Sequence, residues 1–129
     1  MALANERDEA HGAAAEFLTA IRSSGQVVCT SDFVLGETIT GLYRTLGAGA
    51  AEKAMTSILR SVHRGEVSLL RIAPERFNAA IALRRKFEDK PHISFTDLTS
   101  AAVMRELGIT EVFSGDRHFG QIGFVLVPS

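Results

Sequence analysis

Four short apolar runs, separated by longer helix-like segments, are the feature that most restricts how this chain can fold. The runs are QVVCT at 26–30, VSLLRIA at 67–73, TEVFS at 110–114 and GFVLV at 123–127. Short runs rich in apolar and β-branched residues indicate strands that are buried on both faces. Because such strands alternate with helices here, the sequence predicts an α/β domain with a parallel sheet covered by helices on both faces.

The segments between these runs carry signals for the starts and ends of helices. We expect an alanine-rich helix from Asp8 to Ser24, and a second helix that Ser31 or Asp32 caps and that ends near Leu46. Further helices are expected over 50–63, from Pro74 to about Glu88, and over 95–107, where Gly108 ends the last one.

Length and composition limit the class of protein. The chain has 129 residues, which suits one domain, and no run approaches the ~20 apolar residues that span a bilayer. Cys29 is the single cysteine, so no internal disulfide can form and a reducing cytoplasm is the expected compartment. The net charge of −1 does not favour nucleic-acid binding driven by bulk charge. Basic residues gather in LRRKFEDK (83–90) and at Arg60, His63 and Arg64, and are expected to be mainly a solvated helix face. The alternative is that they line a groove for a phosphate backbone.

Glu37 is the most informative carboxylate. It is the only charged residue between Phe33 and Tyr43, in a helix that is apolar around most of its circumference. A buried carboxylate is costly unless it is paired, neutralised or bound to a metal. The alternative is a partly exposed Glu37 that pairs with Arg44 or another base at the surface, and the sequence leaves both readings open.

Asp97 and Asp116 stand at two points where the chain reverses. Asp97 falls in the first turn of its helix, where Ser94-x-x-Asp97 matches a capping box, and Gly-Asp at 115–116 is common in turns. In a parallel sheet, however, the functional crevice lies beyond the carboxyl ends of the strands, and Asp116 follows such an end. Together with Glu37 these acids could form the oxygen cluster that Mg²⁺ or Mn²⁺ prefers.

Other kinds of site are not supported. The stretch LGAGAAEK at 46–53 lacks the Gly-Lys-Ser/Thr ending of a phosphate-binding loop, and no Cys/His cluster suggests zinc. Cys29 lies in a short apolar strand and is expected to belong to the core rather than to act as a nucleophile.

Two stretches of the sequence carry a family resemblance, TSDFVLGETITGLY and SFTDLTSAAVMRELGITEVFSGDRHFGQIGFVLVP. They resemble PIN-domain ribonucleases, specifically the VapC-type toxins of VapBC toxin–antitoxin pairs, and the similarity covers nearly the whole chain. The resemblance implies one PIN-like domain over residues 1–129, with helices on both sides of a parallel sheet. It also implies an acidic cluster that binds Mg²⁺ or Mn²⁺ and hydrolyses phosphodiester bonds in RNA.

The resemblance assigns the catalytic and metal-binding roles to Glu37, Asp97 and Asp116, with Ser114 at a hydroxyl position near the site. It further implies an RNA substrate, a VapB-like antitoxin as partner and a homodimer, and the lack of a long apolar run predicts no membrane span. The family also has an aspartate after its first strand, in an Asp-Thr-Ser-like motif, that has no counterpart here. A second hypothesis is therefore a PIN-like module that binds an antitoxin or RNA without cutting it.

The beginning of the chain departs from the family pattern. No apolar strand is apparent before Asp8, and in the family's sheet the first strand lies between those corresponding to 26–30 and 110–114. Its absence would leave these two strands about 10 Å apart with unpaired backbone groups, at a cost above the ~5–15 kcal/mol by which a domain is stable. We therefore expect Met1 not to be the natural start and an upstream segment to supply a strand and an aspartate. The less favoured alternative is that another segment or a second protomer fills the gap.

Overall fold

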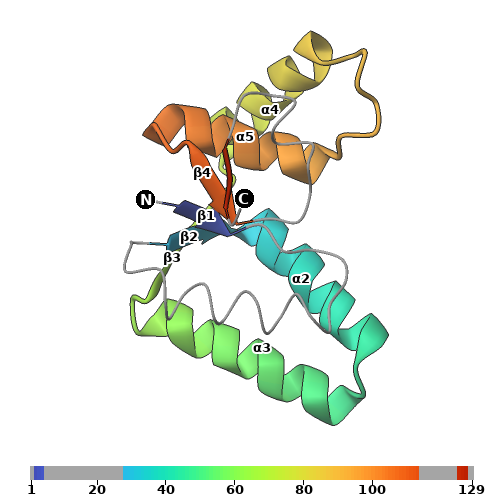
Figure 1. Ribbon diagram of the computed structural model, residues 1–129, viewed down its shortest axis with the longest axis vertical. Coiled ribbons are helices and arrows are strands. Elements are labelled where there is room, and N and C mark those ends of the chain that lie inside the picture. Colours follow the sequence, from blue (N-terminus) through green and yellow to red (C-terminus); the bar gives the residue numbers. More distant parts are fainter. Residues whose placement is uncertain (1, 5–27, 114–124, 128–129) are drawn as a thin grey trace.

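A parallel sheet runs through the middle of the molecule (Figure 1). The computed structural model describes residues 2–4, 28–113 and 125–127, and the side chains of residues 28–110. Within these residues the sheet has five strands in the order β3-β2-β1-β4-β5, and every neighbouring pair is parallel. All four predicted strands are confirmed, although each is short. The strands are β1 (Ala2–Ala4), β2 (Val28–Ser31), β3 (Val67–Leu70), β4 (Glu111–Phe113) and β5 (Val125–Val127).

Strand β1 corrects the expectation for the beginning of the chain. Residues 2–4 lie between β2 and β4, where Leu3 is level with Cys29 on one side and with Val112 on the other. The prediction that no strand precedes Asp8 was wrong, because residues 2–4 occupy the place for which an upstream strand was expected. The sequence Ala-Leu-Ala has no β-branched residue and no alternation, so a pattern-based reading misses it. A central position in a sheet decides its conformation instead.

Helices cover both faces of the sheet, so the expected three-layer α/β architecture is confirmed (Figure 1). Helices α2 and α3 lie on one side, and helices α4 and α5 lie on the other. The helix expected from Asp8 to Ser24 falls outside the described residues. None of the described helices has the length and apolar character needed to cross a bilayer. The bounds are α2 (Asp32–Thr45), α3 (Ala48–His63), α4 (Pro74–Lys86) and α5 (Phe95–Leu107).

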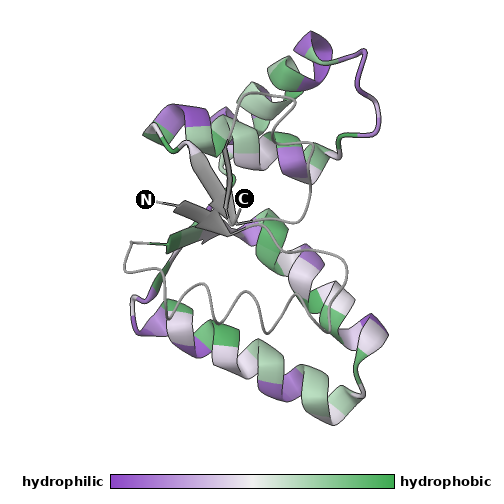
Figure 2. Ribbon diagram, in the orientation of Figure 1, coloured by the Kyte–Doolittle hydropathy of each residue, from purple (hydrophilic) through white to green (hydrophobic). Residues whose placement is uncertain are grey.

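Strand β2 contributes to two separate hydrophobic cores. Successive side chains of a strand point to opposite faces, so Val28 and Cys29 diverge. Val28 packs with buried residues of α2 and α3, whereas Cys29 packs with buried residues of α4 and α5. Burial raises the pKa of the Cys29 thiol to about 11, which confirms a core cysteine and leaves no thiolate near neutral pH. Hydrophobic and hydrophilic residues alternate along the helices of both layers, as expected for helices with one buried face (Figure 2).

The helix ends follow the predicted capping signals. Ser31 is the N-cap of α2, and its Oγ accepts a hydrogen bond from the Val34 amide at 3.2 Å. Ser94 caps α5 in the same way by accepting from the Asp97 amide at 3.1 Å. Gly108 ends α5 with a φ of 68°, in the left-handed region that favours glycine.

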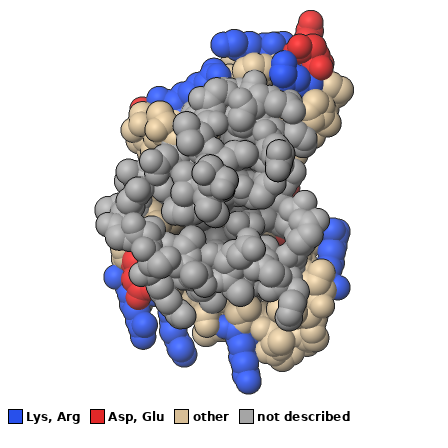
Figure 3. Space-filling model, viewed as in Figure 1, with Lys and Arg blue, Asp and Glu red and all other residues tan. Residues whose placement is uncertain are grey.

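The environment of Arg84 differs from the solvated helix face that was predicted for residues 83–90. Its guanidinium is partly buried and donates to the carbonyls of Phe87, Lys90 and Ile93 at 2.6–2.8 Å, so it holds the connection between α4 and α5. The rest of that segment agrees with a solvated surface, because the end of α4 and the loop after it are strongly hydrophilic (Figure 2). On the face shown in Figure 3, the described Lys and Arg side chains are scattered around the rim and form no continuous patch.

An ion pair joins α4 to α5. Arg76 Nε and Nη2 donate to the two carboxylate oxygens of Glu106 at 2.9 and 2.8 Å, and Arg76 Nη1 donates to the Arg71 carbonyl. The hydrogen bonds from Arg76 lower the pKa of Glu106. The pair therefore ties the C-terminal turn of α5 to the start of α4 and to the connection that precedes it.

This ion pair predicts a pH-dependent contribution to stability. Because the folded-state pKa of Glu106 lies below its unfolded value, the stabilisation is complete above the unfolded pKa and disappears as the pH falls through the folded one. Glu106→Gln should lower the free energy of unfolding by about 0.5–1 kcal/mol at pH 7, a small value because both groups are near the surface. Urea unfolding at pH 7 and at pH 3 measures this. An equal loss at both pH values would contradict the electrostatic origin.

Candidate metal centre

The N-termini of α2 and α5 meet at the edge of the sheet where the strands end (Figure 1). Helix α2 begins at Asp32, directly after β2, so its first turns lie at the carboxyl end of that strand. Helix α5 leads through Gly108 and a short connection into β4, so its opposite end, the N-terminus, lies toward the same edge. This edge is the usual place for a site in a parallel α/β fold.

A hydrogen bond joins these two helices at Glu37. Thr96 Oγ1, in the first turn of α5, donates to Glu37 Oε1 in the second turn of α2 at 3.0 Å. Thr96 is buried and Glu37 is half-buried. Because Asp97 directly follows Thr96, the contact brings the helix glutamate and the Thr-Asp aspartate to one place. Two of the three predicted site residues therefore come from adjacent helices at the expected edge of the sheet.

Asp97 combines a structural and a chemical role. Its amide donates to Ser94 Oγ, which confirms the predicted N-terminal cap, and acids are favoured in this first turn by the helix dipole. Its side chain, however, is only 1% exposed. A capping acid at a helix surface needs no such burial, and a buried carboxylate must be compensated by its surroundings or by a cation. The observed burial therefore supports a role beyond capping.

The environment of Glu37 matches neither of the two interpretations that the sequence left open, a buried carboxylate or an ion pair at the surface. Glu37 is neither fully buried nor in an ion pair with another described residue. It lines an open cavity of about 730 Å³ along one face of α2, together with Phe33, Gly41 and Arg44. Arg44 lines the same cavity, but it does not form the ion pair with Glu37 that the second interpretation required. A half-buried carboxylate that faces a cavity is accessible to a ligand.

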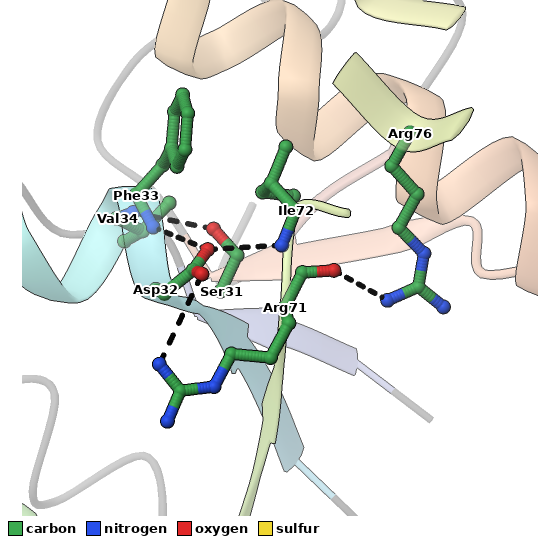
Figure 4. A network of polar contacts seen from close by, with 7 residues as sticks. All are labelled: Ser31, Asp32, Phe33, Val34, Arg71, Ile72 and Arg76. Carbon is green, nitrogen blue, oxygen red and sulfur yellow. Dashed lines mark hydrogen bonds and ion pairs between the residues drawn. The ribbon is translucent and has the colours of Figure 1, made fainter. Parts of the chain in front are cut away.

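Asp32 holds the start of α2 in place, a role that the sequence showed only as a possible cap. Its Oδ1 accepts from the amides of Phe33 and Ile72 at 2.9 and 3.1 Å (Figure 4). Its Oδ2 lies 4.0 Å from the Arg71 guanidinium. Because the Ile72 amide bonds to Asp32, the chain leaves the sheet after Leu70, and the predicted strand 67–73 is shortened. No local signal reveals this contact, because it joins residues 40 positions apart.

Asp116 and Ser114 lie outside the described residues, so their predicted places in the site stay predictions. Among the residues that the structure describes, no group of three or more His, Cys, Asp or Glu side chains is arranged to hold a metal. The described part of the candidate centre therefore consists of two acids, Glu37 and Asp97, with Thr96 between them.

The comparisons with known proteins identify the family of this chain. The model of the PIN domain matches residues 1–125. The chain belongs to the PIN-domain family. VapC20 from two strains of Mycobacterium tuberculosis, named a 23S rRNA-specific endonuclease, is 36% identical over 126 residues, which are 98% of this chain and 90% of that protein. The crystal structure of M. tuberculosis VapC20, titled a sarcin–ricin loop cleaving toxin, matches with a TM-score of 0.76 and 30% identity over 97% of each chain.

Membership of the PIN-domain family gives the two acids a chemical context. Glu37 and Asp97 offer hard oxygen donors, the kind that Mg²⁺ and Mn²⁺ select. The burial of Asp97 and the orientation of Glu37 by the Thr96 hydroxyl fit a cation at this edge. Within the described chain, the roles of these two residues as metal ligands stay predictions.

The Thr96–Glu37 hydrogen bond predicts a selective effect on cation binding. Thr96→Val keeps the shape of the side chain but removes the donor, so Glu37 loses its fixed orientation. We expect the affinity for Mn²⁺ to fall roughly tenfold, the lower end of the range for lost partners of metal ligands. Titration calorimetry with Mn²⁺ measures this. Thr96→Ser keeps the hydroxyl and serves as the matched control, and equal Mn²⁺ affinities for the Val and Ser variants would contradict the role.

Proposed function

We propose that this chain is a metal-dependent endoribonuclease toxin of a type II toxin–antitoxin system that hydrolyses phosphodiester bonds in RNA. The observation that carries the proposal is the meeting of Glu37 with the Thr96–Asp97 pair at the carboxyl edge of a PIN-domain sheet. The printed description of VapC20 as a 23S rRNA-specific endonuclease supports RNA as the class of substrate. The particular RNA and cleavage site do not follow from it.

The proposed roles of the residues follow from their positions. Asp97 is buried in the first turn of α5 and supplies a fixed carboxylate, while Glu37 supplies a second one from the wall of the open cavity. Thr96 holds Glu37 by its hydrogen bond. We propose Asp116 as the third acid, on the basis of the family resemblance. A divalent cation at this place supplies charge stabilisation for the phosphate and lowers the pKa of a water molecule.

Partners are proposed on the same family basis. We propose a VapB-like antitoxin whose segment covers the acidic site, a homodimer, and a location in the cytoplasm. The similarity to VapC-type toxins supports the antitoxin. The single cysteine is consistent with a reducing compartment.

One observation favours a second candidate function. The family's first strand carries an aspartate in an Asp-Thr-Ser-like motif, and this motif has no counterpart in the sequence. A cluster with one carboxylate fewer attracts a cation less strongly. The alternative is therefore a PIN-like module that binds an antitoxin or RNA without cutting it.

Asp97→Asn separates the two candidate functions. For a nuclease, removal of this charge should lower the rate of RNA cleavage in Mg²⁺ or Mn²⁺ by roughly 100-fold or more, the scale for a lost preorganised charge. Stability should change by no more than about 1 kcal/mol, because Asn keeps the size of the side chain and the Ser94 cap remains, so that the main change is the loss of a charge near the helix dipole. Cleavage of a labelled RNA and urea unfolding are the measurements.

The matched control is Asp89→Asn, which makes the same change at an exposed carboxylate on the loop after α4. Its cleavage rate should equal that of the unsubstituted chain, and EDTA should stop cleavage by both. Cleavage by Asp97→Asn at the full rate would remove Asp97 from the catalytic set. RNA binding without any metal-dependent cleavage by the unsubstituted chain would favour the binding module.

The homodimer is tested by size-exclusion chromatography with light scattering. At micromolar concentration we expect a mass near twice the 13.9 kDa of one chain. The expectation rests on the family resemblance and on the exposed apolar side chains of α2 and α3, Tyr43 and Leu59. A single species of about 14 kDa would contradict it.

A further inference from the structure

Three phenylalanine rings from three different helices meet beside the candidate metal centre. Phe77 of α4 lies with its ring centroid 5.0 Å from that of Phe95 in α5 and 6.5 Å from that of Phe33 in α2. The two ring pairs are inclined at 58° and 68°, within the range of favourable tilted and edge-to-face contacts. We call Phe33, Phe77 and Phe95 the aromatic cluster.

The ring of Phe77 is not part of either hydrophobic core. Phe95 packs against the core between the sheet and helices α4 and α5, but Phe33 and Phe77 belong to neither core cluster. Phe77 is 41% exposed. A single exposed apolar side chain is ordinary, and Leu107 is exposed to the same degree at the other end of α5. Phe77 differs from Leu107 in its position beside the candidate metal centre.

Each of the two rings beside Phe77 lies on a helix that also carries one of the two carboxylates. Phe33 and Glu37 are four residues apart on α2, share one face of that helix and line the same open cavity. Phe95 is followed by Thr96, which bonds to Glu37, and by Asp97. The aromatic cluster therefore forms the border of the candidate centre where the three helices approach one another.

Cations lie on both sides of this border. Arg71, in the connection between β3 and α4, has a side chain that is 73% exposed and only a long 4.0 Å contact with Asp32 (Figure 4). Arg44 lines the far end of the cavity that begins at Asp32 and Phe33. An exposed aromatic ring flanked by arginines is the combination that binds single-stranded nucleic acid, where bases stack on rings and phosphates pair with cations.

We propose that the exposed ring of Phe77 is a stacking platform for one unpaired base of the RNA, next to the phosphodiester bond that Glu37 and Asp97 address. This inference rests on the proposed function, because it names how the substrate of the same site is held. Phe33 and Phe95 hold the ring in place, and Arg71 binds a neighbouring phosphate. The platform selects RNA that is single-stranded at this point, because a paired base cannot leave its stack without cost.

An RNA base suits this place better than an apolar segment of a protein. The apolar surface is one ring, bounded by two carboxylates and an arginine, and is too small for an apolar helix face. It matches one planar base joined to an anionic backbone. A protein partner on the ring remains an outcome that the experiment can detect.

The experiment measures RNA binding without cleavage. Binding of a fluorescent single-stranded oligoribonucleotide is followed by anisotropy in EDTA, for the unsubstituted chain and for Phe77→Leu, which keeps apolar volume but not the ring. We expect Phe77→Leu to weaken binding at least about fivefold, the lower end of the effect for one stacked base. Phe77→Trp should restore it. Leu107→Ala, an equally exposed apolar residue away from the site, should leave binding unchanged.

A series of RNAs with a single abasic nucleotide locates the stacked base. At one position the abasic RNA should bind the unsubstituted chain and Phe77→Leu equally, because the interaction is already lost, while at other positions the difference persists. Circular dichroism and thermal unfolding confirm that each variant is folded. Equal binding of intact RNA by the unsubstituted chain and by Phe77→Leu would overturn the proposal, and so would a difference that persists at every abasic position.

The outcomes separate this inference from the proposed function. If the unsubstituted chain neither binds nor cuts RNA, the proposed function fails. If it binds and cuts RNA with Mn²⁺ but Phe77→Leu binds as tightly, only the stacking platform fails. If Phe77→Leu weakens binding of an antitoxin and leaves RNA binding unchanged, the ring belongs to a protein interface and the platform is likewise overturned.

Discussion

The pairing of β1 with two neighbours is the constraint on which the rest of the structure depends. Strand β1 is the link between the β2–β3 half of the sheet and the β4–β5 half. Because strands are spaced about 4.8 Å apart, β1 sets β2 and β4 about 10 Å apart. Helix α2 begins where β2 ends, and α5 leads into β4, so this spacing also sets the distance between the two helices. The hydrogen bond from Thr96 to Glu37 joins the two helices at that separation.

At the candidate centre, the environment in which Asp97 would best stabilise helix α5 differs from the environment that the whole fold gives it. A first-turn acid such as Asp97 stabilises a helix when it is solvated near the positive end of the dipole. Here the fold buries it to 1% exposure, which costs free energy unless a cation or a hydrogen-bonding group compensates. This burial supports the proposal that a divalent cation binds at this edge, because the cation would offset the cost of the buried charge.

Much of the fold could be predicted from local patterns. The four apolar runs each contain a strand, and the caps at Ser31 and Ser94 and the end at Gly108 act over a few residues, so short-range chemistry decides them. The prediction failed at β1, because Ala-Leu-Ala has no strand preference of its own. It also failed at Arg84, which a charge count assigns to solvent but which instead bonds to three carbonyls. At β1 and at Arg84, contacts with other parts of the chain override the structure that the local sequence favours.

By itself, the sequence determined the α/β class, the helix limits and the acids worth testing, because apolar periodicity, capping residues and an isolated charge in an apolar helix act locally. It did not determine which groups meet. The contact of Thr96 with Glu37 spans 59 residues, that of Asp32 with Ile72 spans 40, and the aromatic cluster draws its rings from three helices. Only the tertiary structure decided these contacts, because the order of strands in the sheet sets which helix ends converge.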